Sequence, residues 1–161
     1  MAVYSPALAI PPLVESQAQL RHQLGMLADF WNTCAELELT KRPEPGRWCR
    51  KEILGHLIDS ALNNHHRIVG TSLAAPSHQL RPYDQDAWIR VADYRSYPSA
   101  ELLTLWTSLN NLILRLINRL PPHLLEHEYL TLNSNPTTLH WLISGYALHP
   151  EHHVWQIIHG D

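Results

Sequence analysis

Residues 139–158 read LHWLISGYALHPEHHVWQII. Their apolar side chains recur at the spacing of one helix face, which predicts a helix that starts near Thr138. The residues that carry this stripe are Leu139, Leu142, Ile143, Tyr146, Val154 and Ile157. His149 and His153, four positions apart, lie on the edge of the same stripe. The stretch therefore combines a core-forming helix with a candidate metal-binding pair.

Three further stretches have helical periodicity, and most of the prolines lie outside them. We expect the first helix within about 13–39 and the second over about 51–69, ended by Gly70. The third is expected over about 99–120, because Ser99 is a good N-cap and two prolines follow the last apolar residue. No strand-like alternation of any length occurs, so no sheet is predicted.

The connection over 71–98 is too long for a tight turn. Its segment DQDAWIRVADY, headed by Asp84, predicts one or two helical turns packed over an end of the bundle. Four amphipathic helices with one long connection between the second and third are typical of an all-α four-helix bundle. We expect a loose N-terminal arm over 1–12 and a single domain over 13–161. Three aromatic residues in connecting segments are candidates for lining a pocket: Trp48, Tyr83 and Trp88.

The composition favours an ordinary globular protein. The chain has 161 residues, of which 45% are hydrophobic and 17% charged. No apolar run approaches the roughly 18 residues that would span a bilayer. Cys34 and Cys49 lack a CxxC partner, which is typical of reduced thiols in a cytosol. Because the net charge is -3 and the basic residues are scattered, we expect a cytoplasmic protein that binds neither nucleic acid nor membrane.

Twelve histidines are the unusual feature of this composition. The pair His149 and His153 could bind a metal ion, or the two side chains could be buried and hydrogen-bonded to neighbours. The same spacing recurs at His123 and His127, where no sustained apolar stripe is present and a surface position is expected. Pro150 removes a backbone hydrogen bond, so either the helix is kinked at His149 or a new helix begins there.

His56 is the candidate third ligand, from the second predicted helix. On a helical wheel it lies opposite the apolar stripe, which by itself indicates a solvated face. The same face could instead line a cleft, where a ligand needs hydrogen-bonding partners. Two ligands from one helix and one from another would give a helical bundle a metal site with an open position. The polar residues on this face are Glu52, His56, Asp59, Ser60, Asn63 and Arg67.

Three segments, PEPGRWCRKEILGHLIDSALNNHHRIV, PYDQDAW and GYALHPEHHVWQI, together resemble the DinB-like (DinB/YfiT) superfamily of metal-dependent enzymes. The similarity covers about residues 13–158. It implies a four-helix bundle, commonly a homodimer, whose metal is held by one histidine of the second helix and an H-x-x-x-H pair of the last. Carried over by position, the ligands are His56, His149 and His153, the trio that spacing also suggests.

The resemblance implies thiol S-transferase-like chemistry on a small electrophile, or metal-assisted hydrolysis. Three neutral imidazoles leave a position on a divalent ion (zinc, nickel or iron) where water or a low-molecular-weight thiol loses its proton near neutral pH. Asp59 or Glu52 could orient a ligand or move a proton, and Asn63 could hold substrate. Two alternatives stay open: a non-catalytic dimeric stress or scaffold protein with a vestigial or structural site, and a small-molecule sensor.

Overall fold

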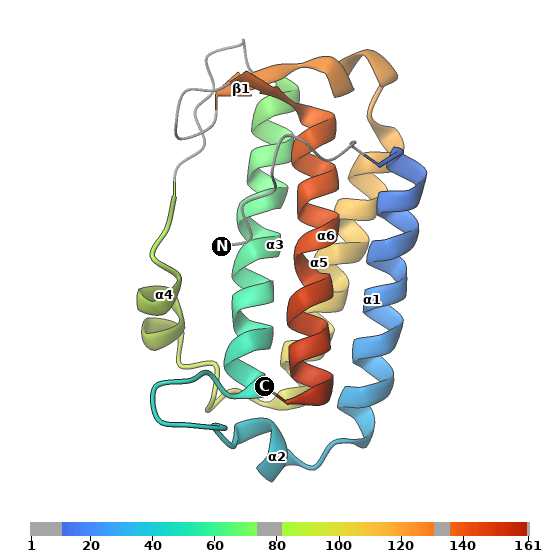
Figure 1. The fold of residues 1–161 in the computed structure, drawn as a ribbon. Coiled ribbons are helices and arrows are strands. Elements are labelled where there is room, and N and C mark those ends of the chain that lie inside the picture. The colour runs from blue at the N-terminus through green and yellow to red at the C-terminus, as the bar shows by residue number, and fades with distance from the viewer. Residues whose placement is uncertain (1–10, 74–81, 131–135, 161) are drawn as a thin grey trace.

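The computed structural model describes residues 11–73, 82–130 and 136–160. Four long helices build a bundle (Figure 1), as predicted: α1 (Leu13–Thr33), α3 (Arg50–Leu73), α5 (Ser99–Arg119) and α6 (Leu139–His159). The connections carry shorter elements: α2 (Glu36–Thr40), α4 (Gln85–Ala92), the 3-10 helix η1 (Pro122–Glu126), and the strands β1 (Glu128–Leu130) and β2 (Pro136–Thr138), which pair antiparallel. Most of the predicted N-terminal arm, residues 1–10, lies outside the described residues.

Each long helix packs on two others. α1 contacts α5 and α6, and α3 contacts the same two helices, so α1 and α3 lie diagonally across the bundle. Figure 1 shows α3 and α5 running upward and α1 and α6 running downward. Because α3 and α5 are parallel neighbours, the chain between them has to return along the length of the bundle. This explains the long connection that the sequence contains at this point.

The core follows the apolar stripes read from the sequence. In α5 the buried positions include Leu102, Trp106, Ile113 and Ile117, at successive spacings of four, seven and four residues. Burying a large apolar side chain of this kind stabilises the fold by about 1.5–3 kcal/mol. The helix α6 starts as predicted, because the Thr138 hydroxyl accepts a hydrogen bond from an N–H in the first turn.

Several predicted boundaries were wrong. The first helix ends at Thr33, and α2 follows it as a separate turn after an extended residue, Cys34. The second helix continues past Gly70 to Leu73, because a glycine costs a helix only about 1 kcal/mol and tertiary packing overrides it. Ser99 is the first helical residue, behind Pro98 at the cap position. The short strand pair was missed, because three-residue strands show no alternation that a sequence pattern can reveal.

α6 is continuous through Pro150, so no new helix begins at His149. The proline removes one helical N–H, but its side chain is buried and contributes to packing. His149 and His153 therefore stay one helical turn apart. The short helix α4 is capped by the Asp84 side chain, as predicted, and lies beside α3 rather than over a bundle end (Figure 1).

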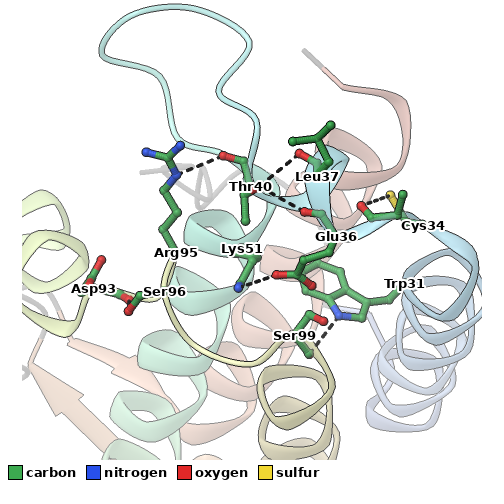
Figure 2. Close-up of polar contacts among 11 residues, drawn as sticks. Trp31, Cys34, Glu36, Leu37, Thr40, Lys51, Asp93, Arg95, Ser96 and Ser99 are labelled. Atoms are coloured by element: carbon green, nitrogen blue, oxygen red, sulfur yellow. Dashed lines mark hydrogen bonds and ion pairs between the residues drawn. The ribbon is translucent and has the colours of Figure 1, made fainter.

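The end of the bundle near α2 contains a group of polar contacts among four residues, of which Trp31 and Lys51 are buried and Glu36 is exposed; the fourth is Ser99. The Lys51 ammonium lies 2.8 Å from the Glu36 carboxylate, and the Trp31 indole donates a hydrogen bond to the Ser99 carbonyl (Figure 2). Lys51 is 2% exposed, so its charge depends on this pairing. None of the helices within the described ranges is long and apolar enough to cross a membrane.

Candidate metal centre

Three histidines converge in the middle of the bundle, between α3 and α6. His56 comes from α3, and His149 and His153 come from successive turns of α6. Their ring centroids are 5.2, 4.8 and 4.9 Å apart, and their candidate ligand nitrogens all lie within 4.8 Å of one another. The structure thus brings together the trio that spacing and family resemblance suggested.

The spacing of these nitrogens fits a small cation. Nε2 of His56 and Nε2 of His149 are 3.3 Å apart. Two nitrogens that each lie about 2.05 Å from one tetrahedral zinc ion would be separated by about 3.3 Å. The observed separation is therefore close to that of two ligands of one metal ion, although a hydrogen bond between the rings would have the same length.

Burial keeps the three rings neutral. Burial, together with the charge that His153 could carry, lowers the pKa of His56 to about 4. The same effects lower the pKa of His149 to about 3, and burial also lowers the pKa of His153. A neutral imidazole is the form that binds a metal ion, so the site needs no deprotonation near pH 7.

The polar face of α3 is buried, so the prediction of a solvated face for His56 was wrong. Every residue from 51 to 60 is buried, and His56 is 1% exposed. Part of the cover comes from Tyr94, whose ring lies so close to Gly55 that a Cβ on the glycine would be 2.1 Å from a ring carbon. The face is polar because it lines the site, which is the cleft alternative that the sequence left open.

Two of the histidines have polar neighbours on their second ring nitrogen. The Ser60 hydroxyl is 3.3 Å from Nδ1 of His149, and Oε1 of Gln156 is 3.3 Å from Nδ1 of His153. Such contacts orient a ligand and leave its other nitrogen free for a metal. Nδ1 of His56 has no hydrogen-bond partner within the described residues, and the Trp48 ring lies against this histidine at 5.4 Å between centroids.

Asp59 lies one turn beyond His56 on α3 and is 4% exposed. Its Oδ1 accepts a 2.6 Å hydrogen bond from the Tyr94 hydroxyl, while its Oδ2 is buried and has no partner among the residues that the structure describes. Burial raises the pKa of Asp59, and the bond from Tyr94 opposes the shift. Asn63 donates its amide to the Asp59 backbone carbonyl. Hydrogen bonds from these two side chains to the trio are absent from the described ranges.

Glu52 has a different role from the one that the sequence suggested. Its carboxylate pairs with the Arg42 guanidinium and accepts a 2.8 Å hydrogen bond from the backbone N–H of Cys49. It therefore caps the start of α3, and no hydrogen bond joins it to the trio within the described residues. The other histidine pair, His123 and His127, lies outside the bundle in and after η1, with ring centroids 6.4 Å apart.

Sequence reasoning missed the contacts made by Gln156 and Tyr94. Gln156 is three residues after His153, so helical spacing could have placed it beside that ring. Tyr94 follows α4, and no local pattern indicates that it reaches α3. Trp48, predicted only as a candidate for lining a pocket, does line a cavity and also lies beside His56.

Comparison with known proteins gives consistent results. A family model described as DinB superfamily matches residues 19–157. Two relatives carry the name "Putative metal-dependent hydrolase". One, from Halalkalibacterium halodurans, is 28% identical over 76% of this chain and 70% of its own. The other, YfiT from Bacillus subtilis, is 25% identical over 92% of this chain and 79% of its own.

Two solved structures share the architecture. The YfiT structure, described as a probable metal-dependent hydrolase with an unusual four-helix bundle topology, gives a TM-score of 0.83 at 21% identity and covers 97% of this chain and 90% of its own. A mycothiol-dependent maleylpyruvate isomerase gives 0.65 at 16% identity, covering 90% of this chain and 58% of its own. At these identities the likeness shows the fold alone.

Proposed function

The chain belongs to the DinB superfamily, and from that premise we propose that it is a metal-dependent enzyme whose divalent ion is bound by His56, His149 and His153. The observation that carries the proposal is the convergence of three neutral imidazoles from two helices, with His56 buried and the other two partly buried. Relatives named as metal-dependent hydrolases support a metal cofactor, and neither they nor the nitrogen ligands select among zinc, nickel and iron.

The proposed reaction is transfer of a low-molecular-weight thiol to a small electrophile, with metal-assisted hydrolysis as the second candidate. A bound divalent ion would lower the pKa of a thiol or water in its open position and so supply a nucleophile. A thiol-dependent isomerase of the same fold favours the first candidate, and the names of the relatives favour the second. Both candidates use the same three histidines.

Asp59 is the proposed proton acceptor. Its Oδ2 has no partner among the described side chains, and burial raises the pKa of its carboxyl, which makes the carboxylate a stronger base. Tyr94 holds the other oxygen and fixes the orientation of the carboxylate. We propose that the Asn63 carbonyl oxygen holds substrate, because its amide nitrogen is already bonded to its own helix.

Elemental analysis of protein purified without a histidine tag tests the metal site. We expect close to one divalent ion per chain, lost on dialysis against a chelator and lost in His153→Ala. The matched control is His152→Ala, which removes the neighbouring exposed histidine and should keep the metal. A metal-free protein that is equally stable with and without chelator would favour a non-catalytic bundle instead.

The reaction class can be separated from the metal site. Metal-loaded protein is assayed with a chromogenic aryl halide and 2-mercaptoethanol for thiol transfer, and with an aryl ester for hydrolysis. Asp59→Asn should retain the metal and lose most of the turnover. If Asp59→Asn kept full activity at every pH, Asp59 would not be the proton acceptor.

A homodimer is also proposed, and it rests on the family resemblance. Two tryptophans, Trp155 (49% exposed) and Trp88 (41% exposed), present apolar surface that an interface could cover. Gel filtration at low protein concentration tests the proposal. A strict monomer would contradict it.

A further inference from the structure

A cavity of about 240 Å³ lies where α3 begins and α6 ends. It is smaller than the roughly 300–1,000 Å³ of pockets that enclose drug-sized ligands, so it suits one end of a small molecule. The residues that line it are Glu38, Lys41, Pro43, Trp48, Arg50, Ile53, Gln156 and Gly160.

The cavity adjoins the histidine trio. Its wall includes Trp48, whose ring is 5.4 Å from the His56 ring, and Gln156, whose Oε1 is 3.3 Å from Nδ1 of His153. Two lining side chains thus contact two of the three candidate ligands directly. A molecule in the cavity is therefore separated by one side chain from two of the candidate ligands.

The cavity is locally basic in an acidic protein. Residues 41–50 contain four of the chain's 12 lysines and arginines and a single acidic residue, although the net charge of the chain is -3. Among the lining residues, Arg50 donates to the carbonyls of Ile157 and Glu38. Lys41, by contrast, has no hydrogen bond or ion pair with any part of the chain that the structure describes.

An uncompensated cation on the wall of a cavity favours an anion. Glu38 is the acidic residue of the lining, and its carboxylate lies 4.0 Å from Arg50. This leaves the positive charge of Lys41 unbalanced. Lys41 is exposed, so its effect on binding is moderate and sensitive to salt.

We infer that this cavity binds a carboxylate at one end of the thiol substrate, with Lys41 as the cation that selects it, while the sulfur end reaches the histidine trio. The inference rests on the proposed function, since it concerns a substrate of the same site. It identifies the substrate class as a small anionic thiol. Trp48 both lines the cavity and lies against His56, so its ring would flank the thiol along its length.

The test uses protein loaded with cobalt(II), whose visible spectrum changes when a thiol enters the coordination sphere. Three thiols of similar size are titrated at low salt: 3-mercaptopropionate (anionic), 2-mercaptoethanol (neutral) and cysteamine (cationic). For each variant we compare one ratio, the dissociation constant of the neutral thiol divided by that of the anionic thiol. When this ratio is compared between variants, the intrinsic difference between the two thiols cancels.

In Lys41→Gln we expect this ratio to fall by about threefold to fivefold, the size typical of an exposed ion pair. The matched control is Arg47→Gln, which removes a positive charge from the same segment at a residue that does not line the cavity. The ratio should stay near the wild-type value in this control. Lys41→Arg should also retain it.

Two results would overturn the inference, and they are distinguishable. If cobalt binds and the ratio is the same in all variants, or falls equally in Lys41→Gln and Arg47→Gln, the cavity does not select anions and the proposed metal site stands. If cobalt(II) fails to bind the wild-type protein, the proposed function fails and the inference fails with it.

Discussion

Two groups of buried polar residues lie a short distance apart on α3, and they are organised in opposite ways. At the start of the helix, Lys51 pairs with Glu36 and Glu52 pairs with Arg42, so each buried charge meets an opposite charge. Near the middle of the bundle, His56 faces two further histidines, and no acidic side chain is hydrogen-bonded to the trio within the described ranges.

The difference separates a structural role from a functional one. The pairs at the start of α3 are complete without any addition, and they fix α2 and the loop before α3 against the bundle. The trio leaves Nδ1 of His56 without a partner among the described residues, and it brings together three groups that would repel one another if protonated. Protein atoms alone do not complete this group, so a cation is the natural addition.

Acid should affect the two groups at different pH, and this is the largest expected effect. On folding, the pKa of His56 falls from 6.5 to about 4, and that of His149 falls to about 3. Below pH 6.5 the unfolded metal-free chain therefore binds protons at these two histidines, whereas the folded chain does not. The free energy of unfolding should therefore decrease as the pH falls from about 6.5 towards 4. At about 1.4 kcal/mol per pKa unit, the loss is on the order of several kcal/mol.

Urea unfolding of metal-free protein at pH 7.5, 6, 5 and 4.5 measures this loss. In His56→Phe the free energy of unfolding should decrease less steeply with falling pH, because this variant lacks one buried imidazole. The charge pairs at the start of α3 should contribute little over this range, since the pKa of Glu36 is lowered by its hydrogen bond from Lys51. Equal slopes for the wild type and His56→Phe would show that the trio does not cause the acid sensitivity.

The second prediction concerns the ion pair between Lys51 and Glu36 at the start of α3. Glu36→Ala leaves the Lys51 ammonium buried without its partner, which should lower the free energy of unfolding by about 2 kcal/mol after allowance for the exposed position of Glu36. Thermal and urea unfolding measure the loss. Glu38→Ala is the matched control, because its ion pair with Arg50 is long and exposed. The metal content of folded Glu36→Ala should equal that of the wild type, and a reduced content would mean that the two groups are not independent.

The third prediction concerns Ser60, which contacts one histidine of the trio. Ser60→Ala removes the hydroxyl beside Nδ1 of His149 and should lower metal affinity by about tenfold, with little change in the stability of the metal-free protein. Competition with a chromophoric chelator measures the affinity. Ser108→Ala, at an exposed position of α5, is the control. If the two variants bound metal equally well, Ser60 would not orient the ligand.

The smallest expected effect concerns Tyr94, which covers the polar face of α3. Tyr94→Phe removes the hydrogen bond to Oδ1 of Asp59 and should lower the free energy of unfolding by about 1 kcal/mol. It should also raise the pKa of Asp59 further, since that hydrogen bond lowers it. The pH profile of turnover would shift upward, while Tyr97→Phe, on the exposed surface, should leave stability and pH profile unchanged. An unshifted profile in Tyr94→Phe would exclude Asp59 as the group that sets it.

The helices were predictable because their stripes are long and regular. In α5 and α6 the apolar residues recur over five turns or more, and the helices begin within one residue of the predicted positions. Helix ends were less predictable where packing outweighs local preference, as at Gly70. The strand pair between α5 and α6 depends on tertiary contacts, and it is too short to leave a periodic signal.

The site was predictable only in part, for a related reason. The spacing of His149 and His153 is a local property of one helix, and the sequence shows it directly. The surroundings of His56 depend on residues outside its helix: Trp48 and the two histidines of α6 lie against its ring, on a face whose composition resembles a solvated surface. A helical wheel measures polarity and cannot distinguish a polar surface from a polar cleft.

The continuity of α6 affects when the protein could acquire a metal ion. Two of the three histidines lie on this helix, which the ribosome makes after every other described element. A nascent chain that has only α1, α3 and α5 exposes a single imidazole of the trio, too few to retain a cation. If the trio binds a metal ion as proposed, capture follows synthesis, and the ion bound depends on the supply of free metals in the compartment where the completed chain folds.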